Sequence, residues 1–107
     1  MQVLQQGRTL EEKNARDILK IICNDQAMKI LQATTTDIPK SAFEISTKSG
    51  IPLTQVYRWI HRLHSYGLVR ISGDTNEFGK KFFMYQSKIT SIKVSLNTST
   101  EPVIEIL

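Results

Sequence analysis

Six side chains that could hydrogen-bond to nucleic-acid bases or phosphates lie within nine consecutive residues of the sequence. They are Thr54, Gln55, Tyr57, Arg58, His61 and Arg62. An arginine can donate to O6 and N7 of guanine, and a glutamine amide can pair with N6 and N7 of adenine. Between these residues, Val56, Ile60 and Leu63 recur at helical spacing. The pattern predicts a helix from Pro52 to Tyr66 that buries one apolar face and directs the six polar side chains outward.

A short capped helix and a tight turn should hold this helix in place. Ser41 and Glu44 have the spacing of a capping box, in which the hydroxyl and the carboxylate each accept from a backbone N–H. The helix that they open should end at Gly50, because glycine readily adopts the left-handed conformation. Pro52 suits the start of the next helix, where its missing N–H costs nothing. We therefore expect two helices joined by a tight turn, with the second presented to solvent.

After Gly67 the apolar period changes from 3.6 to 2, which predicts a β-hairpin. Its strands are expected at 68–72 and 81–86, joined by a loop of turn-forming residues. Lys80 and Lys81 near the tip are candidate phosphate contacts. The aromatic residues expected in the hairpin core are Phe82, Phe83 and Tyr85.

The N-terminal part of the chain should be an arm followed by a helix. Residues 1–8 are interpreted as a loose arm or a short strand, and residues 9–23 as a helix capped by Thr9. Cys23 is expected to be a half-buried structural thiol at the end of that helix. Residues 24–86 would then hold the core of the domain, starting with a second helix that Asn24 or Asp25 caps.

Residues 87–107 are predicted to form a C-terminal β extension. Two alternating runs, 92–96 and 103–107, indicate a second hairpin whose turn would be residues 97–100. The first run alternates Ile92, Val94 and Leu96, which could serve equally as core or as a dimer interface. The fold class expected for residues 1–107 is a single α+β domain, mainly α, with three to four helices and two hairpins.

The formal charge is unevenly distributed along the chain, whose net charge is +4. Residues 1–47 contain six bases and six acids, and residues 94–107 contain only two acids. The middle segment, residues 48–93, contains eight bases against two acids. A basic segment of this kind is typical of proteins with a polyanionic partner.

The stretch SAFEISTKSGIPLTQVYRWIHRLHSYGLVRI resembles the helix-turn-helix and first wing strand of ArsR-like and TrmB-like winged-helix transcription regulators. The residues that carry the resemblance are Ala42, Ile45, Gly50-Ile51-Pro52, Val56-Tyr57-Arg58, Leu63 and Gly67-Leu68-Val69. The upstream stretch ILKIICNDQAMKILQA resembles the entry of the ArsR-like group, so that the resemblance covers about residues 15–86.

The resemblance implies a winged helix-turn-helix protein that binds double-stranded DNA as a homodimer, joined through the first helix and the C-terminal elements. The helix from Pro52 to Tyr66 would recognise the major groove, and the hairpin would be the wing. Metal-sensing members carry cysteines in the helix that here reads Ala42, Phe43, Ile45 and Ser46. Metalloid sensing at that site is therefore excluded on ligand chemistry.

Other classes of function have less support in the sequence. Acids and histidines are not clustered as a catalytic pair or triad requires, so that we do not expect an enzyme. His61 and His64 lack an evident third ligand for a metal, and no cofactor or small-molecule effector is indicated. No apolar run is long enough to cross a membrane and no signal peptide is evident, which predicts a cytoplasmic protein.

Two alternatives to DNA binding remain. Winged helices also serve as protein–protein adaptors in transcription and replication machinery, and some bind RNA. An adaptor should have a neutral or acidic recognition helix with exposed apolar residues. Here Arg58 and Arg62 occur in that helix with no acid, which favours nucleic acid. Trp59, beside the apolar face, is expected to pack against a neighbouring helix.

Overall fold

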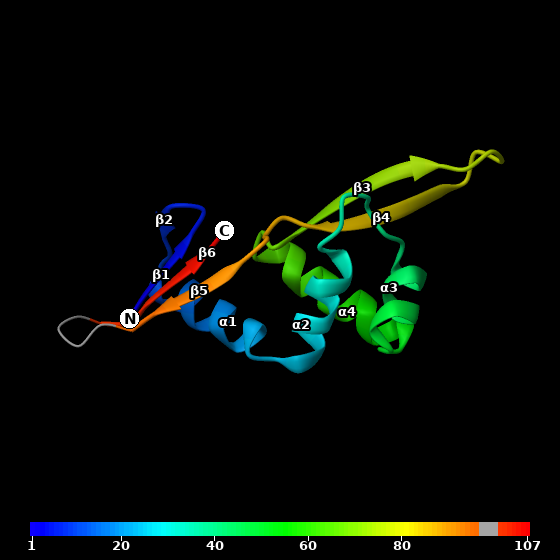
Figure 1. The fold of residues 1–107 in the computed structure, drawn as a ribbon. Coiled ribbons are helices and arrows are strands. Elements are labelled where there is room, and N and C mark those ends of the chain that lie inside the picture. Colours follow the sequence, from blue (N-terminus) through cyan, green and yellow to red (C-terminus); the bar gives the residue numbers. More distant parts are fainter. Residues whose placement is uncertain (97–100) are drawn as a thin grey trace.

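The computed structural model describes residues 1–96 and 101–107, which form four helices and two β-sheets (Figure 1). The helices are α1 (Glu12–Ile22), α2 (Asp25–Thr34), α3 (Ala42–Ser49) and α4 (Leu53–Ser65). The strands are β1 (Gln2–Gln5), β2 (Arg8–Thr9), β3 (Val69–Thr75), β4 (Lys81–Ser87), β5 (Ile92–Ser95) and β6 (Val103–Ile106). The molecule is elongated, with extents of 60 × 25 × 24 Å. The α+β class is confirmed, in an arrangement that is compatible with a winged helix.

The core lies between the four helices and the inner faces of the sheets. Each helix contributes apolar residues at helical spacing, such as Ile18 and Ile21 in α1 and Ile30 in α2. Val56, Ile60 and Leu63 of α4 are fully buried, as the sequence predicted. Thr34 is the buried polar residue of this core, and its hydroxyl donates to the carbonyls of Ile30 and Leu31.

The N-terminal caps of α2 and α3 are among those that the sequence predicted. The Asn24 side chain accepts from the Ala27 N–H at 3.1 Å and starts α2. Ser41 and Glu44 form the predicted capping box, and the Ser41 backbone N–H lowers the pKa of the Glu44 carboxyl. The capping box therefore favours the ionised form of Glu44 and stabilises the fold when this carboxylate is charged. That stability is lost as the pH falls below the ordinary pKa of a glutamate and through the lowered pKa of Glu44.

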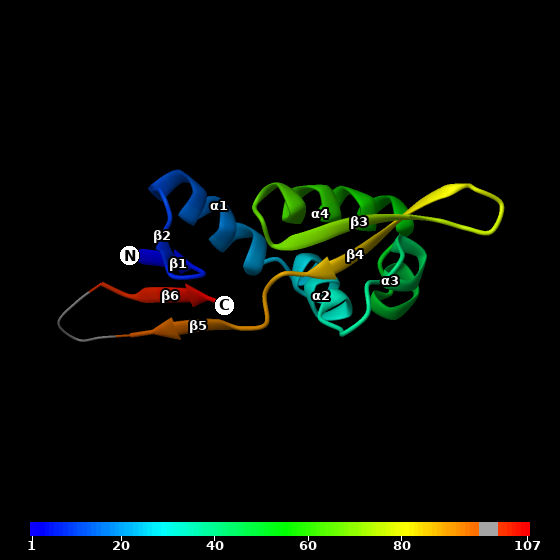
Figure 2. The same cartoon turned by 90° about the horizontal axis from the view of Figure 1, so that it is seen from above.

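The hairpin of β3 and β4 is longer than predicted and projects beyond the helices (Figure 2). Residues 73–75, expected in the loop, continue β3 and pair with residues 81–83. At its base, Lys40 exchanges backbone hydrogen bonds of 2.8 and 2.7 Å with Tyr85. The segment between α2 and α3 therefore anchors the hairpin against the helices.

The second sheet brings the two ends of the chain together, with strand order β2-β1-β6-β5. The predicted second hairpin is confirmed, because β5 and β6 pair antiparallel; its proposed turn, residues 97–100, lies outside the described residues. The parallel pairing of β1 with β6 was not predicted. Of the two interpretations of residues 1–8, the short strand is correct.

Two predictions at the ends of α1 were wrong. Thr9 does not cap this helix, because it is paired with Leu4 in the β1–β2 hairpin and α1 begins only at Glu12. Cys23 is exposed rather than half-buried, because it is the C-terminal cap of α1 and lies beyond the last turn that faces the core.

Candidate nucleic-acid interface

The turn between α3 and α4 is fixed by side-chain hydrogen bonds. Gly50 has φ of +74°, the left-handed conformation expected of it. The Ser46 hydroxyl donates to the Ile51 carbonyl at 2.6 Å, and the Ile51 N–H donates to the Ser49 hydroxyl at 3.3 Å. Both serines lie in the last turn of α3, so that they hold the start of α4 at a defined angle to it.

Four of the six predicted contact residues of α4 share its solvent-facing side. We call these residues the α4 outer face: Thr54, Arg58, His61 and Arg62. All four are exposed, and they lie opposite the buried residues of the same helix. Within residues 1–96 and 101–107, no carboxylate lies within 4.0 Å of the two arginines of this face. Their guanidinium groups are therefore available to an anionic partner.

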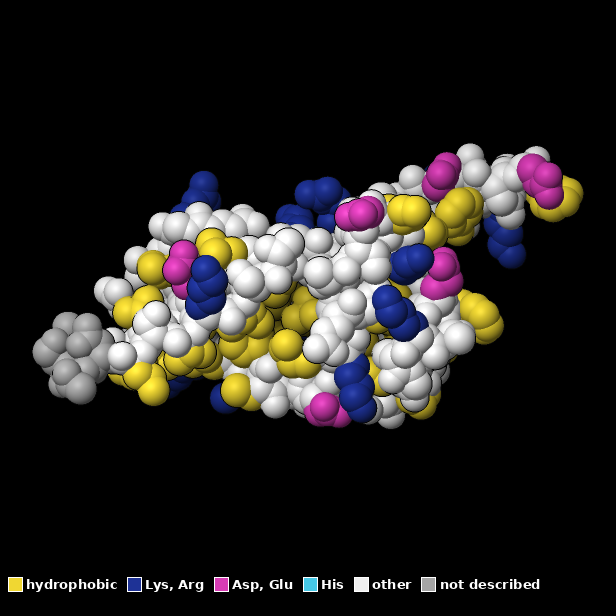
Figure 3. Space-filling view, viewed as in Figure 1, with side chains coloured by type: hydrophobic (Ala, Val, Ile, Leu, Met, Phe, Trp, Pro, Cys, Tyr) yellow, Lys and Arg dark blue, Asp and Glu magenta, His cyan; other side chains and the backbone are white. Residues whose placement is uncertain are grey.

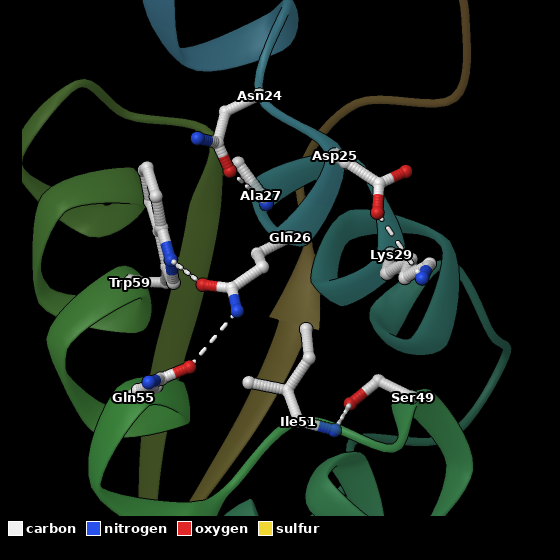
Figure 4. A network of polar contacts seen from close by, with 9 residues as sticks. All are labelled: Asn24, Asp25, Gln26, Ala27, Lys29, Ser49, Ile51, Gln55 and Trp59. Carbon is white, nitrogen blue, oxygen red and sulfur yellow. Dashed lines mark hydrogen bonds and ion pairs between the residues drawn. The ribbon is translucent and has the colours of Figure 1, made fainter.

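Gln55, by contrast, is only partly exposed, because its side chain turns toward α2 and is less outward than predicted (Figure 4). Its Oε1 accepts from Nε2 of Gln26 at 2.9 Å, and Oε1 of Gln26 accepts from the Trp59 indole N–H at 3.0 Å. The half-buried Trp59 packs against the core, as expected. This network of three side chains braces α4 against α2. No sequence signal indicated Gln26, which lies 29 residues from Gln55 and meets it only in the folded chain.

Arg62 is partly ordered by the same network. Its guanidinium carbon lies 5.2 Å from the centroid of the Trp59 ring, in a cation–π arrangement. Arg62 is therefore held in position before any partner arrives, which lowers the entropy cost of forming a hydrogen bond.

The opposite flank of α4 faces the β3–β4 hairpin. Nδ1 of His64 lies 3.0 Å from the Val69 carbonyl oxygen at the start of β3. Tyr57, half-exposed on this flank, lies close enough to Tyr85 of β4 to affect its pKa, which burial raises and Tyr57 raises further. Tyr57 is therefore at the junction of helix and hairpin, with part of its surface open to a partner.

Lys80 and Lys81 lie at the exposed end of the hairpin. The turn before them is held by Asn76, whose Oδ1 accepts from the backbone N–H groups of Phe78 and Lys80, both at 2.9 Å. By strand register, Lys81 shares a face with Tyr85, which is the face turned toward the helices. A partner lying along α4 would therefore meet this side of the hairpin.

The prediction that aromatic residues fill the hairpin core holds only for Tyr85. Phe82 and Phe83 are exposed, because the hairpin extends past the helices that bury its base. Phe78 at the tip is 85% exposed. The hairpin thus offers both apolar and basic groups to solvent, together with the acids Asp74 and Glu77.

The basic segment is divided between several surfaces. Lys93 belongs to the C-terminal sheet, and Lys88 lines a hollow with Arg8 near the end of α4. The candidate residues of α4 and the hairpin tip, Arg58, Arg62, Lys80 and Lys81, are only four of the eight bases of this segment. The net charge of residues 48–93 therefore overstates the size of the candidate interface.

Comparison with protein-family models found no match, and comparison with curated protein sequences found no significant relative. In the described part of the chain, no three His, Cys, Asp or Glu side chains come together as a metal site would need. No described helix has the length and apolar composition that a membrane crossing demands.

Proposed function

We propose that this protein is a winged helix-turn-helix transcription regulator that binds specific sequences of double-stranded DNA. The observation that carries the proposal is the α4 outer face, on a helix braced by its neighbours. It has four exposed hydrogen-bonding side chains, two of them arginines that have no carboxylate partner among the described residues. A helix of this size fits the major groove, which is about 12 Å wide.

The residues divide into two roles under this proposal. Arg58 and Thr54 lie in the first two turns of α4, and Arg58 would donate to the O6 and N7 atoms of guanine. Arg62, His61 and the hairpin lysines would contact phosphates, with the hairpin on the backbone or in the minor groove. Tyr57 would contact the DNA at the junction, whereas Gln55 acts through the position of α4.

We further propose that the protein binds DNA as a homodimer. Two copies related by a two-fold axis would place two α4 helices in successive major grooves, which requires an inverted-repeat site. Val94 and Leu96 support a self-association surface, because they are 61% and 83% exposed, respectively, outside the candidate interface.

A protein–protein adaptor is the second candidate function, and one observation favours it. Phe43 of α3 is 72% exposed. The three phenylalanines of the hairpin, Phe78, Phe82 and Phe83, are exposed as well. Large exposed aromatic residues are typical of protein interfaces. Phe43 borders a hollow with Lys40 and Thr47, on a helix that DNA in contact with α4 need not cover.

Binding of duplex DNA across a range of salt concentrations tests the proposal and distinguishes the two functions. If Arg62, Lys80 and Lys81 each neutralise one phosphate, a homodimer should show a slope of about −5 for log affinity against log salt concentration. Lys81→Ala should weaken all duplex sequences alike and make that slope less steep by about 0.9 per copy.

Thr47→Ala, a substitution in the exposed part of α3, serves as the control in this titration and should leave the slope unchanged. DNA affinity that does not depend on salt, in the wild type and in the Lys81 variant alike, would contradict the proposal and favour the adaptor.

A further inference from the structure

Strand β5 leaves one edge of the four-stranded sheet unpaired within the described residues. It is the last strand in the order β2-β1-β6-β5, and Figure 2 shows it along the outer side of the sheet. Ser91 and Leu107 exchange backbone hydrogen bonds of 2.9 and 3.0 Å. In antiparallel sheets, hydrogen-bonded pairs alternate with pairs that are not hydrogen-bonded to each other. The backbone N–H and C=O groups of Lys93 therefore point to β6, and those of Ile92 and Val94 point to the free edge.

The same alternation places apolar side chains along one face of β5. Ile92, Val94 and Leu96 share the face on which Ile104 and Ile106 of β6 are buried. Ile92 packs partly against the core, but Val94 and Leu96 extend past it. An unpaired edge with exposed apolar side chains is the kind of strand that pairs with another chain.

An apolar hollow of about 460 Å³ lies beside the start of β5. Four apolar residues line it, Met28 and Leu31 of α2 with Ile89 and Ile92, and the polar residues Gln32, Thr35, Thr90 and Ser91 complete the lining. Figure 3 shows hydrophobic side chains recessed near the centre of the molecule, where α2 and β5 lie in Figure 1. The hollow therefore opens on the side of the molecule that carries the free edge.

We infer that a second copy of this chain pairs along β5, antiparallel, with Val94 on the two-fold axis. In this register Leu96 of the partner subunit lies directly opposite Ile92 and on the same face, at the mouth of the hollow. By symmetry each copy supplies both the inserted leucine and the hollow. Each chain thus carries both halves of a self-complementary interface, which is what a two-fold dimer needs.

The charges on β5 select this register over its nearest alternative. A two-fold axis at Val94 pairs Lys93 with Ser95 of the partner subunit. An axis at Lys93 would also join the free backbone groups, but it would set two lysines directly opposite each other, which is destabilising. The interface specifies the proposed homodimer but does not depend on DNA binding, because its residues lie outside the α4 outer face and the hairpin.

Light scattering of the free protein tests the interface without DNA. The wild type should have twice the chain mass of 12.2 kDa. Leu96→Glu would place a carboxylate in the apolar hollow of the other copy and should raise the dimer dissociation constant at least about tenfold. Ile38→Glu is the matched control. Ile38, like Leu96, has a large aliphatic side chain that is mostly exposed, at 67%, and it is distant in sequence from β5.

Circular dichroism should show that both variants keep the wild-type fold, because neither replaced side chain is buried in one chain. A wild-type protein that is monomeric at micromolar concentration would overturn the inference. A Leu96→Glu variant that dimerises as tightly as the wild type would overturn it as well.

Disulfide cross-linking tests the register. In a Cys23→Ser background, Val94→Cys should oxidise to a covalent dimer, because the two Cα atoms of a hydrogen-bonded antiparallel pair are about 5.5 Å apart, within disulfide range. Lys93→Cys should cross-link much less, because its counterpart lies two positions away along the partner strand. Cross-linking through residue 93 and not residue 94, or through neither, would contradict the proposed pairing.

Discussion

Arg58→Ala should lower affinity for the preferred DNA site by about 1–3 kcal/mol, or roughly 5- to 150-fold, and flatten the preference for that site. Arg58 lies in the middle of the α4 outer face, is exposed, and has no carboxylate within ion-pairing distance among the described residues. Under the proposed function, its loss removes both a base contact and a cation. Fluorescence anisotropy with the preferred site and a scrambled duplex would measure both effects.

Arg16→Ala is the control for this substitution. Arg16 is exposed on α1 and lies outside the α4 outer face, so that this variant removes the same side chain and the same charge elsewhere. It should change affinity little for either duplex. Equal losses in the two variants would mean that Arg58 contributes only general charge and reads no base.

Leu63→Ala should lower the free energy of unfolding by about 2–5 kcal/mol. Leu63 is fully buried in the last turns of α4, where removal of its side chain leaves a cavity between the helix and the core. Since domains of this size are stable by only about 5–15 kcal/mol, the variant should have a much lower urea midpoint.

Leu53→Ala makes the same change at the start of α4 and is the matched control. Leu53 remains 39% exposed, so less apolar area returns to water when it is truncated. Its loss of stability in urea denaturation should be clearly the smaller of the two. Equal losses of stability in the two variants would show that α4 does not bury the side that contains Leu63. The α4 outer face would then not be the side turned to solvent.

Local signals in the sequence predicted the helical part of the fold well. The apolar spacing of Val56, Ile60 and Leu63, the capping box at Ser41 and the glycine at 50 each act within a few residues of the chain. Such signals can be read without knowledge of the tertiary structure. The hairpins follow from the change to a two-residue period.

The place of β1 and β2 in the four-stranded sheet could not be predicted in this way. The parallel pairing of β1 with β6 joins residues about one hundred positions apart, and nothing in residues 2–5 specifies that partner. Thr9 is a residue type that often caps helices, but in the fold it pairs with Leu4 in the β1–β2 hairpin. The tertiary context therefore overrode a local preference.

The candidate site was predicted in its location but not in every residue. Helical periodicity places Gln55 at the edge of the polar face, and only the position of Gln26 on α2 decides that it turns inward. The exposure of Phe82 and Phe83 depends on how far the hairpin extends beyond the helices, which strand alternation cannot reveal.

Selection from random duplex DNA at physiological salt tests the central proposal most directly. The proposal predicts enrichment of an inverted repeat whose half-sites are centred about 10–10.5 base pairs apart, or a multiple of that spacing, as two α4 helices in successive major grooves require. A pool that shows no enriched sequence after repeated rounds would contradict the assignment of this protein as a sequence-specific regulator.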